Sequence, residues 1–343
     1  MKKNKIATAL AVLLAAQLLT GCGTNSSGIK QVEGLQPTTQ PLSLEQIQQE
    51  LAIEETVPPQ AQQPESMGRT IEQDGVTWRY NTRLRTVLFM GVDTRAGAEN
   101  KIGIGNNGRS DTLLLFVIDP DHESVQLITI SRDTMTKVDV YDRDRNYLFS
   151  GKMQVTMQYS FGDSAARSCQ LVKKKISNLL YDLPINYHCS LTLDGILAAS
   201  DLLGGIKLTL EDDWTDIDPT YTAGSTITLK GEQLERFLRY RDIQVSGSND
   251  VRMSRHGWFI RQLFRQMGTV GSTGVDMLLN KLDPYLETDL DADTIKQLTS
   301  YHLSDEILKV PGETIRGKAH DEYYVDEEAC KQMILDVFYI PEQ

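Results

Sequence analysis

Apolar positions are spread unevenly along the chain and divide it into four parts. A short apolar run covers 6–19, directly behind three early lysines. Residues 22–80 are rich in Gln, Pro, Ser, Thr and Glu, and such a segment buries too little apolar surface to fold alone. Beyond it, apolar positions recur with the periods of strands and helices. This pattern predicts a folded domain over 84–270 and a C-terminal extension over 271–343 that packs on it.

The periodic segments of the folded part predict an α/β protein. The segment 112–119 is almost continuously apolar, which is typical of a strand covered on both faces. The strand-like segments are 86–93, 112–119, 125–131, 187–193 and 206–210. The helix-like segments are 164–180, 194–205, 231–238, 252–267 and 326–338. We expect Asp194 to cap the second of these helices, and we predict an αβα sandwich with a central mixed β-sheet.

The N-terminal apolar run predicts export and a lipid anchor. The run is too short to span a bilayer comfortably and fits the core of a signal peptide. It ends in Leu-Thr-Gly-Cys at 19–22, which resembles the lipobox of bacterial lipoproteins. We therefore expect residues 1–21 to be a lipoprotein signal peptide and Cys22 to carry the lipid. The mature protein would lie on the extracellular face of the cell membrane, with 22–80 as a flexible tether.

Charge and cysteine content exclude some classes of function. The net charge is −12, so bulk attraction to nucleic acid or anionic lipid is not expected, and any anion must meet a local cationic cluster. Transcriptional regulation is disfavoured for the same reason. Three cysteines follow Cys22, namely Cys169, Cys189 and Cys330, without a C-x-x-C pair. We expect buried free thiols, although a Cys169–Cys189 disulfide is an alternative.

An arginine-rich segment, 239–256, supplies such a cluster. On a helix over 252–267, Arg252 and His256 fall within the apolar stripe and Arg255 lies at its edge. The N-terminus of that helix also offers free N–H groups and a positive dipole to an anion. Two further arginines, Arg239 and Arg241, would face the same side if their backbone is extended. We expect the four arginines to converge on one site.

The same helix also carries arginines that we expect to be solvated. Arg261 and Arg265 fall opposite the apolar stripe. If only one face of this helix is buried, these two arginines should face solvent and take no part in the site.

Carboxylates and further arginines lie at the ends of the predicted strands. Asp93 and Arg95 follow the first strand, Arg109 and Asp111 precede the second, and Arg132 follows the third. Strand ends are where α/β folds place ligands. Magnesium prefers one or two carboxylates together with water and phosphate oxygens, whereas arginine binds phosphate in bidentate fashion. These segments therefore predict a site for a metal ion and a phosphate group.

Taken in order, these motifs resemble the LytR-CpsA-Psr family. The matching segments are "GVDTR", "GRSDTLLLFVIDP", "LITISRDT", "GKMQVTMQYSFGD", "YHCSLTLDGI" and "LRYRD…NDVRMSRH". The resemblance implies an αβα envelope phosphotransferase that moves a glycopolymer from a polyprenyl diphosphate carrier to a peptidoglycan hydroxyl, forming a phosphodiester. Some members use a protein acceptor instead.

The resemblance also implies roles for individual residues. Asp93 and Asp111 match the family's magnesium ligands, with Mn²⁺ as a possible substitute. The residues that match its diphosphate-binding arginines are Arg132, Arg239, Arg241 and Arg252. The remaining expected substrate-binding residues are Arg95, Arg109, Lys152, Arg255 and His256. The candidates for a groove that holds the lipid tail are Ile196, Leu197, Leu202, Ile260 and Phe264.

The chain departs from the family pattern at three points. His256 stands where glutamine is usual, and we expect it to be buried and neutral. Gln154 stands where the family has asparagine, and the lipobox replaces a transmembrane helix. Two other functions use the same residues: a pyrophosphatase acting on the same lipid, and a non-catalytic lipoprotein that binds an anionic glycan. Paired carboxylates argue against the second, because an anion site gains nothing from acids without a cation.

Overall fold

The computed structural model describes residues 68–95, 108–142, 144–242, 244–245, 247–318 and 320–342. These residues all belong to one compact unit, Pro41–Gln343. The expected signal peptide, Cys22 and most of the expected tether lie outside the described residues. Within the described ranges, no helix combines the length and apolar character needed to cross a bilayer.

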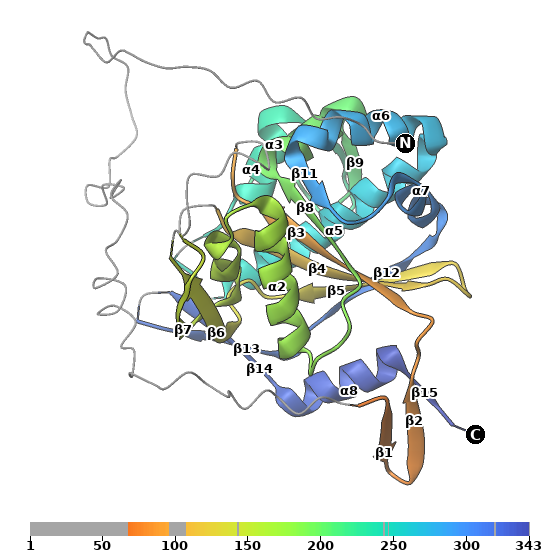
Figure 1. The fold of residues 1–343 in the computed structure, drawn as a ribbon. Coiled ribbons are helices and arrows are strands. Elements are labelled where there is room, and N and C mark those ends of the chain that lie inside the picture. Colours follow the sequence, from red (N-terminus) through yellow and green to blue (C-terminus); the bar gives the residue numbers. More distant parts are fainter. Residues whose placement is uncertain are drawn as a thin grey trace, which may run out of the picture. The chain divides into compact units, whose positions relative to one another are not determined.

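A six-stranded mixed sheet forms the centre of the fold (Figure 1). Its strands in spatial order are β11 (Leu286–Thr288), β8 (Tyr187–Thr192), β3 (Arg85–Val92), β4 (Ser110–Asp119), β5 (Ser124–Ile130) and β12 (His302–Lys309). β3 pairs with β8 and β5 with β12 in parallel, and the other neighbours are antiparallel. The central mixed sheet predicted from the sequence is confirmed.

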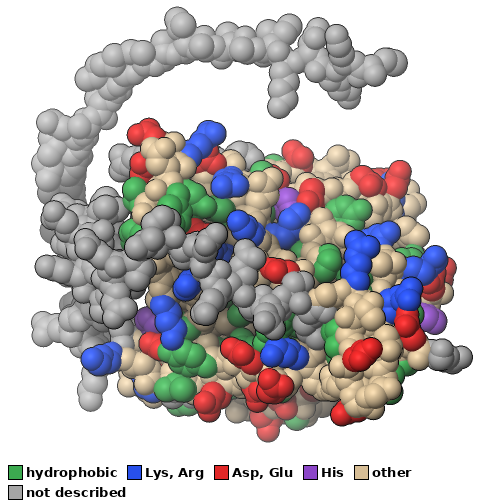
Figure 2. Space-filling model, turned by 60° about the horizontal axis from the view of Figure 1, so that its bottom comes forward, with side chains coloured by type: hydrophobic (Ala, Val, Ile, Leu, Met, Phe, Trp, Pro, Cys, Tyr) green, Lys and Arg blue, Asp and Glu red, His purple; other side chains and the backbone are tan. Residues whose placement is uncertain are grey.

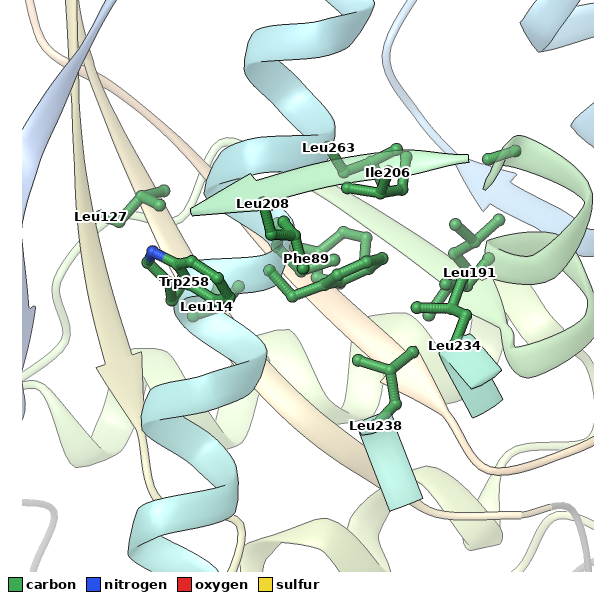
Figure 3. Close-up of a cluster of buried hydrophobic side chains, with 14 of the residues drawn as sticks. Phe89, Leu114, Leu127, Leu191, Ile206, Leu208, Leu234, Leu238, Trp258 and Leu263 are labelled. Atoms are coloured by element: carbon green, nitrogen blue, oxygen red, sulfur yellow. The ribbon is translucent and has the colours of Figure 1, made fainter. Parts of the chain in front are cut away.

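Helices cover both faces of this sheet, as an αβα sandwich requires. One face carries α3 (Leu193–Leu202), α4 (Gly231–Arg239), α5 (Ser248–Thr269), α6 (Gly271–Leu282) and α7 (Ala292–Ser300). The opposite face carries α2 (Ala165–Leu179) and α8 (Glu327–Phe338). Alternate residues of β3 and β4 enter the two cores: Phe89 and Leu114 pack under α5, whereas Leu88 and Leu113 pack under α2 and α8. Figure 3 shows Phe89 within the first core, close to Leu208 and Trp258.

The C-terminal extension completes the sheet rather than merely packing on it. β12 adds to one edge beside β5, and β11 adds to the other edge beside β8. The extension also supplies the hairpin of β13 (Gly312–Arg316) and β14 (Asp321–Val325). The boundary at residue 270 therefore separates two parts of one sheet.

The tether expected over 22–80 extends too far at its end. β1 (Thr70–Gln73) and β2 (Val76–Tyr80) form a hairpin, and β2 also pairs with β15 (Tyr339–Pro341). These residues thus belong to the folded part. The remaining elements are β6 (Met135–Tyr141), β7 (Tyr147–Gln154), η1 (Val155–Phe161), β9 (Ile206–Thr209), β10 (Thr226–Leu229) and η2 (Asp283–Tyr285).

Two local expectations have different outcomes. Asp194 does not cap α3: the N-cap is Thr192, whose hydroxyl accepts a hydrogen bond from the Gly195 N–H, and Asp194 lies in the first turn. The cysteines Cys169, Cys189 and Cys330 are free thiols in the described structure, as expected.

Candidate functional site

The predicted strand-end residues meet at one edge of the central sheet. β3, β5 and β8 end at this edge and β4 begins there, because β4 runs antiparallel to β3. A cavity of about 250 Å³ opens at this edge, between the strand ends, α3, the end of α4 and α5. Its polar and charged lining residues are Asp93, Asp111, Thr112, Arg239, Arg252 and His256. The structure therefore brings both acids and two of the arginines to one cavity.

A register shift in the sheet presents Asp111 to the cavity. Gly91 pairs with Thr112 and the next residue, Val92, pairs with Ser110, so Asp111 is the extra residue of a bulge in β4. Bulges bend a strand locally and turn a side chain that regular pairing would hold elsewhere. The segment before β4 also contacts the other acid, since the backbone N–H of Arg109 donates to Asp93 Oδ1 at 2.7 Å.

Asp93 and Asp111 are close enough to influence each other. Loss of hydration within the protein, followed by repulsion from Asp111, raises the pKa of Asp93. A divalent cation between two carboxylates would relieve this repulsion. The described residues hold no group of three or more His, Cys, Asp or Glu side chains suited to a metal. The donor set therefore fits a cation that takes most of its ligands from water and phosphate, as Mg²⁺ does.

Two arginines flank Asp111. Arg132, which follows β5, forms an ion pair with Asp111 Oδ1, and Arg252 Nη2 in the first turns of α5 lies 3.7 Å from Asp111 Oδ2. Both side chains are about nine-tenths buried, with 11% and 12% exposed. Burial lowers the pKa of Arg252. Two poorly hydrated guanidiniums beside one carboxylate leave an excess of positive charge, which suits an anion.

A buried carboxylate, Asp133, ties these segments together. Its Oδ1 accepts a hydrogen bond from Gln154 at 2.7 Å, and its Oδ2 accepts one from Asn249 at 2.6 Å. Asn249 in turn accepts a bond from Arg252 Nη2 at 2.7 Å, and Arg132 Nε lies 3.3 Å from Asp133. Asp133 thus fixes the segment after β5 against the start of α5, and its burial raises its pKa.

Arg239 and Arg241 diverge, contrary to the extended geometry expected for them. Arg239 is the last residue of α4, lines the cavity and pairs with Glu235 at 3.0 Å. Arg241 lies beyond the helix end, donates to Ser248 and pairs at 3.3 Å with the buried Asp321 at the start of β14. A helix end between the two arginines is the reason for the divergence.

His256 lines the cavity as a neutral imidazole. Its Nε2 must donate to the Leu238 carbonyl at 2.7 Å, so its Nδ1 accepts from the Thr112 hydroxyl at 2.6 Å. Burial, with smaller contributions from Arg252 and other arginines, lowers the pKa of His256 to about 3. The structure shows the burial that the sequence predicts for His256, and the hydrogen bonds are those of a neutral ring.

Several expected substrate-binding residues lie elsewhere. Arg95 is exposed and pairs with Glu235 and Asp194, and Lys152 lies over the ring of Tyr324, 4.7 Å from its centroid. Arg109 contributes its backbone N–H to Asp93, and its charge only partly opposes the rise in the pKa of Asp93 that burial and Asp111 cause. Arg255 is buried and lines a different cavity, on the other side of α5.

The expectation that Arg261 is solvated is wrong. Its side chain is 6% exposed, pairs with Glu211 at 2.8 Å and donates to the Asp305 carbonyl. Arg265 is more exposed, at 37%, and pairs with Asp305. The apolar stripe along 252–267 indicates only one buried face of the helix. In the structure, β12 of the C-terminal extension packs against a second face of α5 and covers Arg261.

Sequence reasoning missed Asn249, Asp321 and Thr156 as supports of the site and noted Gln154 only as a departure from the family pattern. Asn249, Gln154 and Asp321 act through hydrogen bonds to Asp133 and Arg241, and Thr156 donates to Asp111 at 3.4 Å. The sequence does contain one hint of this support. Asn249 lies three residues before Arg252, and on a helix two side chains at this spacing are on the same face and can contact each other.

An apolar cavity of about 120 Å³ adjoins the first one and shares Phe89 and Ile260 with it. Its lining comes from β3, β4, β8 and the helices α3, α5, α6 and α7, and the lining atoms are apolar. Two candidates for the lipid groove, Ile260 and Phe264, line it, whereas Ile196 lines the charged cavity. Leu202 is exposed.

Comparison with known proteins gives one consistent result. Residues 47–336 match the LytR_cpsA_psr family model. The polyisoprenyl-teichoic acid–peptidoglycan teichoic acid transferase TagU of Halalkalibacterium halodurans is 25% identical over 236 residues, covering 67% of this chain and 70% of that protein. The crystal structure of Bacillus subtilis TagU superposes with a TM-score of 0.54 at 21% identity, covering 74% of this chain and 95% of that one. TagT bound to LIIa-WTA superposes with a TM-score of 0.53 at 16% identity, covering 75% and 91%.

Proposed function

The chain belongs to the LytR-CpsA-Psr family, and we propose that it transfers a glycopolymer from a polyprenyl diphosphate carrier to a peptidoglycan hydroxyl. One observation carries this proposal. The cavity with paired acids and two arginines shares two lining residues, Phe89 and Ile260, with an adjoining apolar cavity. A diphosphate joined to a long hydrocarbon needs those two environments side by side. Relatives named as teichoic acid transferases support teichoic acid as the glycopolymer class.

The arginines would bind the diphosphate and stabilise the departing charge. The acceptor oxygen would attack the sugar-proximal phosphorus, and the bond from that phosphorus to the bridging oxygen would break. Polyprenyl phosphate then leaves with the bridging oxygen and the electron pair of the broken bond, and the proton lost by the acceptor hydroxyl ends on this phosphate or in the solvent. Arg132 and Arg252 lie beside Asp111, where this charge would develop, and positioned guanidiniums stabilise it without reorganisation.

A magnesium ion held by Asp93 and Asp111 belongs to the same proposal, with Mn²⁺ as a substitute. When bound, the ion would neutralise phosphate oxygens and orient the substrate. The charge arithmetic explains why arginines are needed as well. Two carboxylates cancel the ion's charge of about +2, so the guanidiniums must offset the diphosphate. Asp133, which is fixed by Gln154 and Asn249, would position Arg132 rather than contact the substrate.

The apolar cavity would hold the first units of the polyprenyl chain. Phe89, Ile260 and Phe264 lie between the sheet and α5, where they would contact hydrocarbon close to the diphosphate. Each methylene buried there contributes about 0.8 kcal/mol. The lipid on Cys22 would keep the protein on the extracellular face of the membrane, within reach of this substrate.

The face of the molecule in Figure 2 shows no broad basic field, since its Lys and Arg side chains are interspersed with Asp and Glu. The net charge of the chain is −12, so the arginines of the site are a local cluster on an acidic protein. This distribution favours recognition of one anionic group over coating of a nucleic acid.

Purified protein should be incubated with a lipid-linked teichoic acid precursor, wall fragments and Mg²⁺. We expect a phosphodiester-linked product and released polyprenyl phosphate, with loss of both after EDTA and recovery on adding Mg²⁺. Arg132→Ala should lower the rate by about 10³-fold, as for other phosphoryl-transfer arginines. Arg145→Ala is the matched control, because Arg145 is 80% exposed and pairs with Asp163 away from the site.

Two outcomes would replace the proposal. Release of inorganic or lipid phosphate at the same rate without wall fragments would identify a pyrophosphatase. Binding of the precursor without turnover and without a metal requirement would identify a glycan-binding lipoprotein.

A further inference from the structure

A second polar cavity lies on the other side of α5. Its volume is about 440 Å³, which makes it larger than the charged cavity at the strand ends. It lies among α5, β12 and the segment that follows β9. The residues that define its chemistry are Glu211, Trp214, Arg255, Trp258, Arg261 and Asp305.

The helix α5 separates the two cavities. Arg252 and His256 line the first, whereas Arg255 and Trp258 line the second. A helix with its side chains is about 10–12 Å across. The two cavities are thus distinct sites on one rigid element.

The walls of this cavity contain two buried arginines. Arg255 and Arg261 are 3% and 5% exposed, respectively. The Arg255 guanidinium lies 5.0 Å from the Trp214 ring centroid and donates to the Tyr240 carbonyl. Within the described structure, the Nε of each arginine has no hydrogen-bond partner. Burial lowers the pKa of Arg255 to about 10. Two incompletely paired buried cations are expensive for stability alone, which points to a use in binding.

The charge of the lining is balanced. Three acids, Glu211, Asp212 and Asp305, face three cations, Arg255, Arg261 and Lys309. Carboxylates only accept hydrogen bonds, so a ligand must bring donors as well as acceptors. A phosphate-rich polymer has few donors and would be repelled by the acids. Hydroxyl and acetamido groups provide both.

Indole rings complete this environment. Trp214 is half-buried, and Trp258 donates from Nε1 to Glu211 at 3.1 Å. Flat aromatic surfaces next to polar groups suit a ligand with apolar C–H faces and a polar edge. A peptide has donors as well, but a basic peptide would meet Arg255 and Lys309, and an acidic one would meet Glu211 and Asp212.

We propose that this cavity binds an uncharged saccharide, with its hydroxyl or acetamido groups on Glu211 and Asp305 and a sugar face on Trp214. The site is separate from the reaction centre and does not depend on the transfer reaction. It would hold a glycan chain against α5 about one helix diameter from the phosphate groups.

Tryptophan fluorescence tests this directly, because two of the three tryptophans line the cavity. Trp78→Phe removes the third, which lies in β2, and leaves a signal from the cavity alone. Chitotetraose, a neutral oligomer of N-acetylglucosamine, is the probe. We expect a saturable fluorescence change in the Trp78→Phe protein.

Variants locate the binding. Trp214→Phe and Glu211→Gln, both in the Trp78→Phe background, should each raise the dissociation constant at least tenfold. Glu328→Gln is the matched control, since Glu328 is 90% exposed on α8, and it should bind normally. Thermal unfolding of each variant confirms that the fold is retained, and titration calorimetry replaces the fluorescence signal where it is weak.

Competition identifies the ligand class and separates this proposal from the transferase proposal. Arg132→Ala should bind chitotetraose normally while losing transfer activity. Absence of saturable binding in the Trp78→Phe protein overturns the saccharide site. So does unchanged affinity in both cavity variants, or stronger binding of polyglycerol phosphate or a peptidoglycan stem peptide than of chitotetraose.

Discussion

The glycine beside Asp93 provides a test that depends only on geometry. Gly108 has φ of +86°, in the left-handed region that L-residues adopt at a cost of about 1–2 kcal/mol. A Cβ at this position would lie 2.4 Å from Thr94 Cγ2 and 3.0 Å from Asp93 Oδ1. The distance to Thr94 is far below van der Waals contact and the distance to Asp93 is tight, so Thr94 or the backbone must move and Asp93 must shift with it. Overpacking of this kind costs about 1–3 kcal/mol.

Gly108→Ala should therefore lower the free energy of unfolding by about 2–5 kcal/mol, the sum of both costs. Gly75→Ala is the matched control, because Gly75 has φ of +76° but its Cβ would meet no described atom within 4 Å. It should lose only the backbone cost, about 1–2 kcal/mol. Urea denaturation of both variants measures the difference at a common m-value.

The collision also predicts a functional effect. Displacing the carboxylate of Asp93 by about 1 Å can reduce a rate about 10²-fold. We expect this loss in Gly108→Ala and normal turnover in folded Gly75→Ala. Equal stability losses in the two variants would refute the contact argument. Full activity in Gly108→Ala would refute the placement of Asp93 in the site.

Three further predictions concern different parts of the chain. Asp133→Ala should lower the free energy of unfolding by about 3–5 kcal/mol in urea denaturation, because it removes the acceptor of the buried Asn249 amide and one of the two acceptors of the half-buried Gln154 amide, and it leaves Arg132 without a partner at this position. A loss below about 1 kcal/mol would contradict the role of Asp133 in holding these segments together. The pKa of the His256 imidazole is 6.5 in the unfolded chain and about 3 in the folded protein. Between these two pH values the unfolded chain therefore binds one more proton than the folded protein. As the pH is lowered below about 6, the free energy of unfolding of the wild type should fall by about 1.4 kcal/mol per pH unit more than that of His256→Gln. If the two proteins lose stability in parallel as the pH falls, this prediction is wrong. Cys22→Ser should move the protein from the membrane fraction to the soluble or secreted fraction, and retention in the membrane would contradict the lipid anchor.

The sequence predicts the centre of the fold better than its edges. The segment 112–119 is almost continuously apolar because both of its faces are covered, and 125–131 is mostly apolar, so their position in the sheet can be inferred. β12 lies at the edge of the sheet, and buried and exposed positions are mixed along it. Its partner β5 lies about 180 residues earlier in the chain. Periodicity within a short window carries no information about such a distant partner.

The candidate site shows the same division. Asp93, Asp111 and Arg132 could be proposed because polar residues at strand ends meet where neighbouring strands end together. The bulge at Asp111 and the helix end between Arg239 and Arg241 depend on single backbone dihedrals, which residue patterns do not specify. Arg255 and Arg261 were misassigned because α5 is covered on two sides, by elements far apart in the chain.

The completion of the central sheet by β11 and β12 has a consequence for biogenesis. Until residues 286–309 have emerged from the ribosome, β8 and β5 lack their outer neighbours, and their unpaired backbone groups are free to join another chain. The nascent protein would therefore need a holding chaperone until its synthesis is complete. A premature stop before residue 302, which removes β12, should yield inclusion bodies or proteolytic fragments rather than a shortened enzyme.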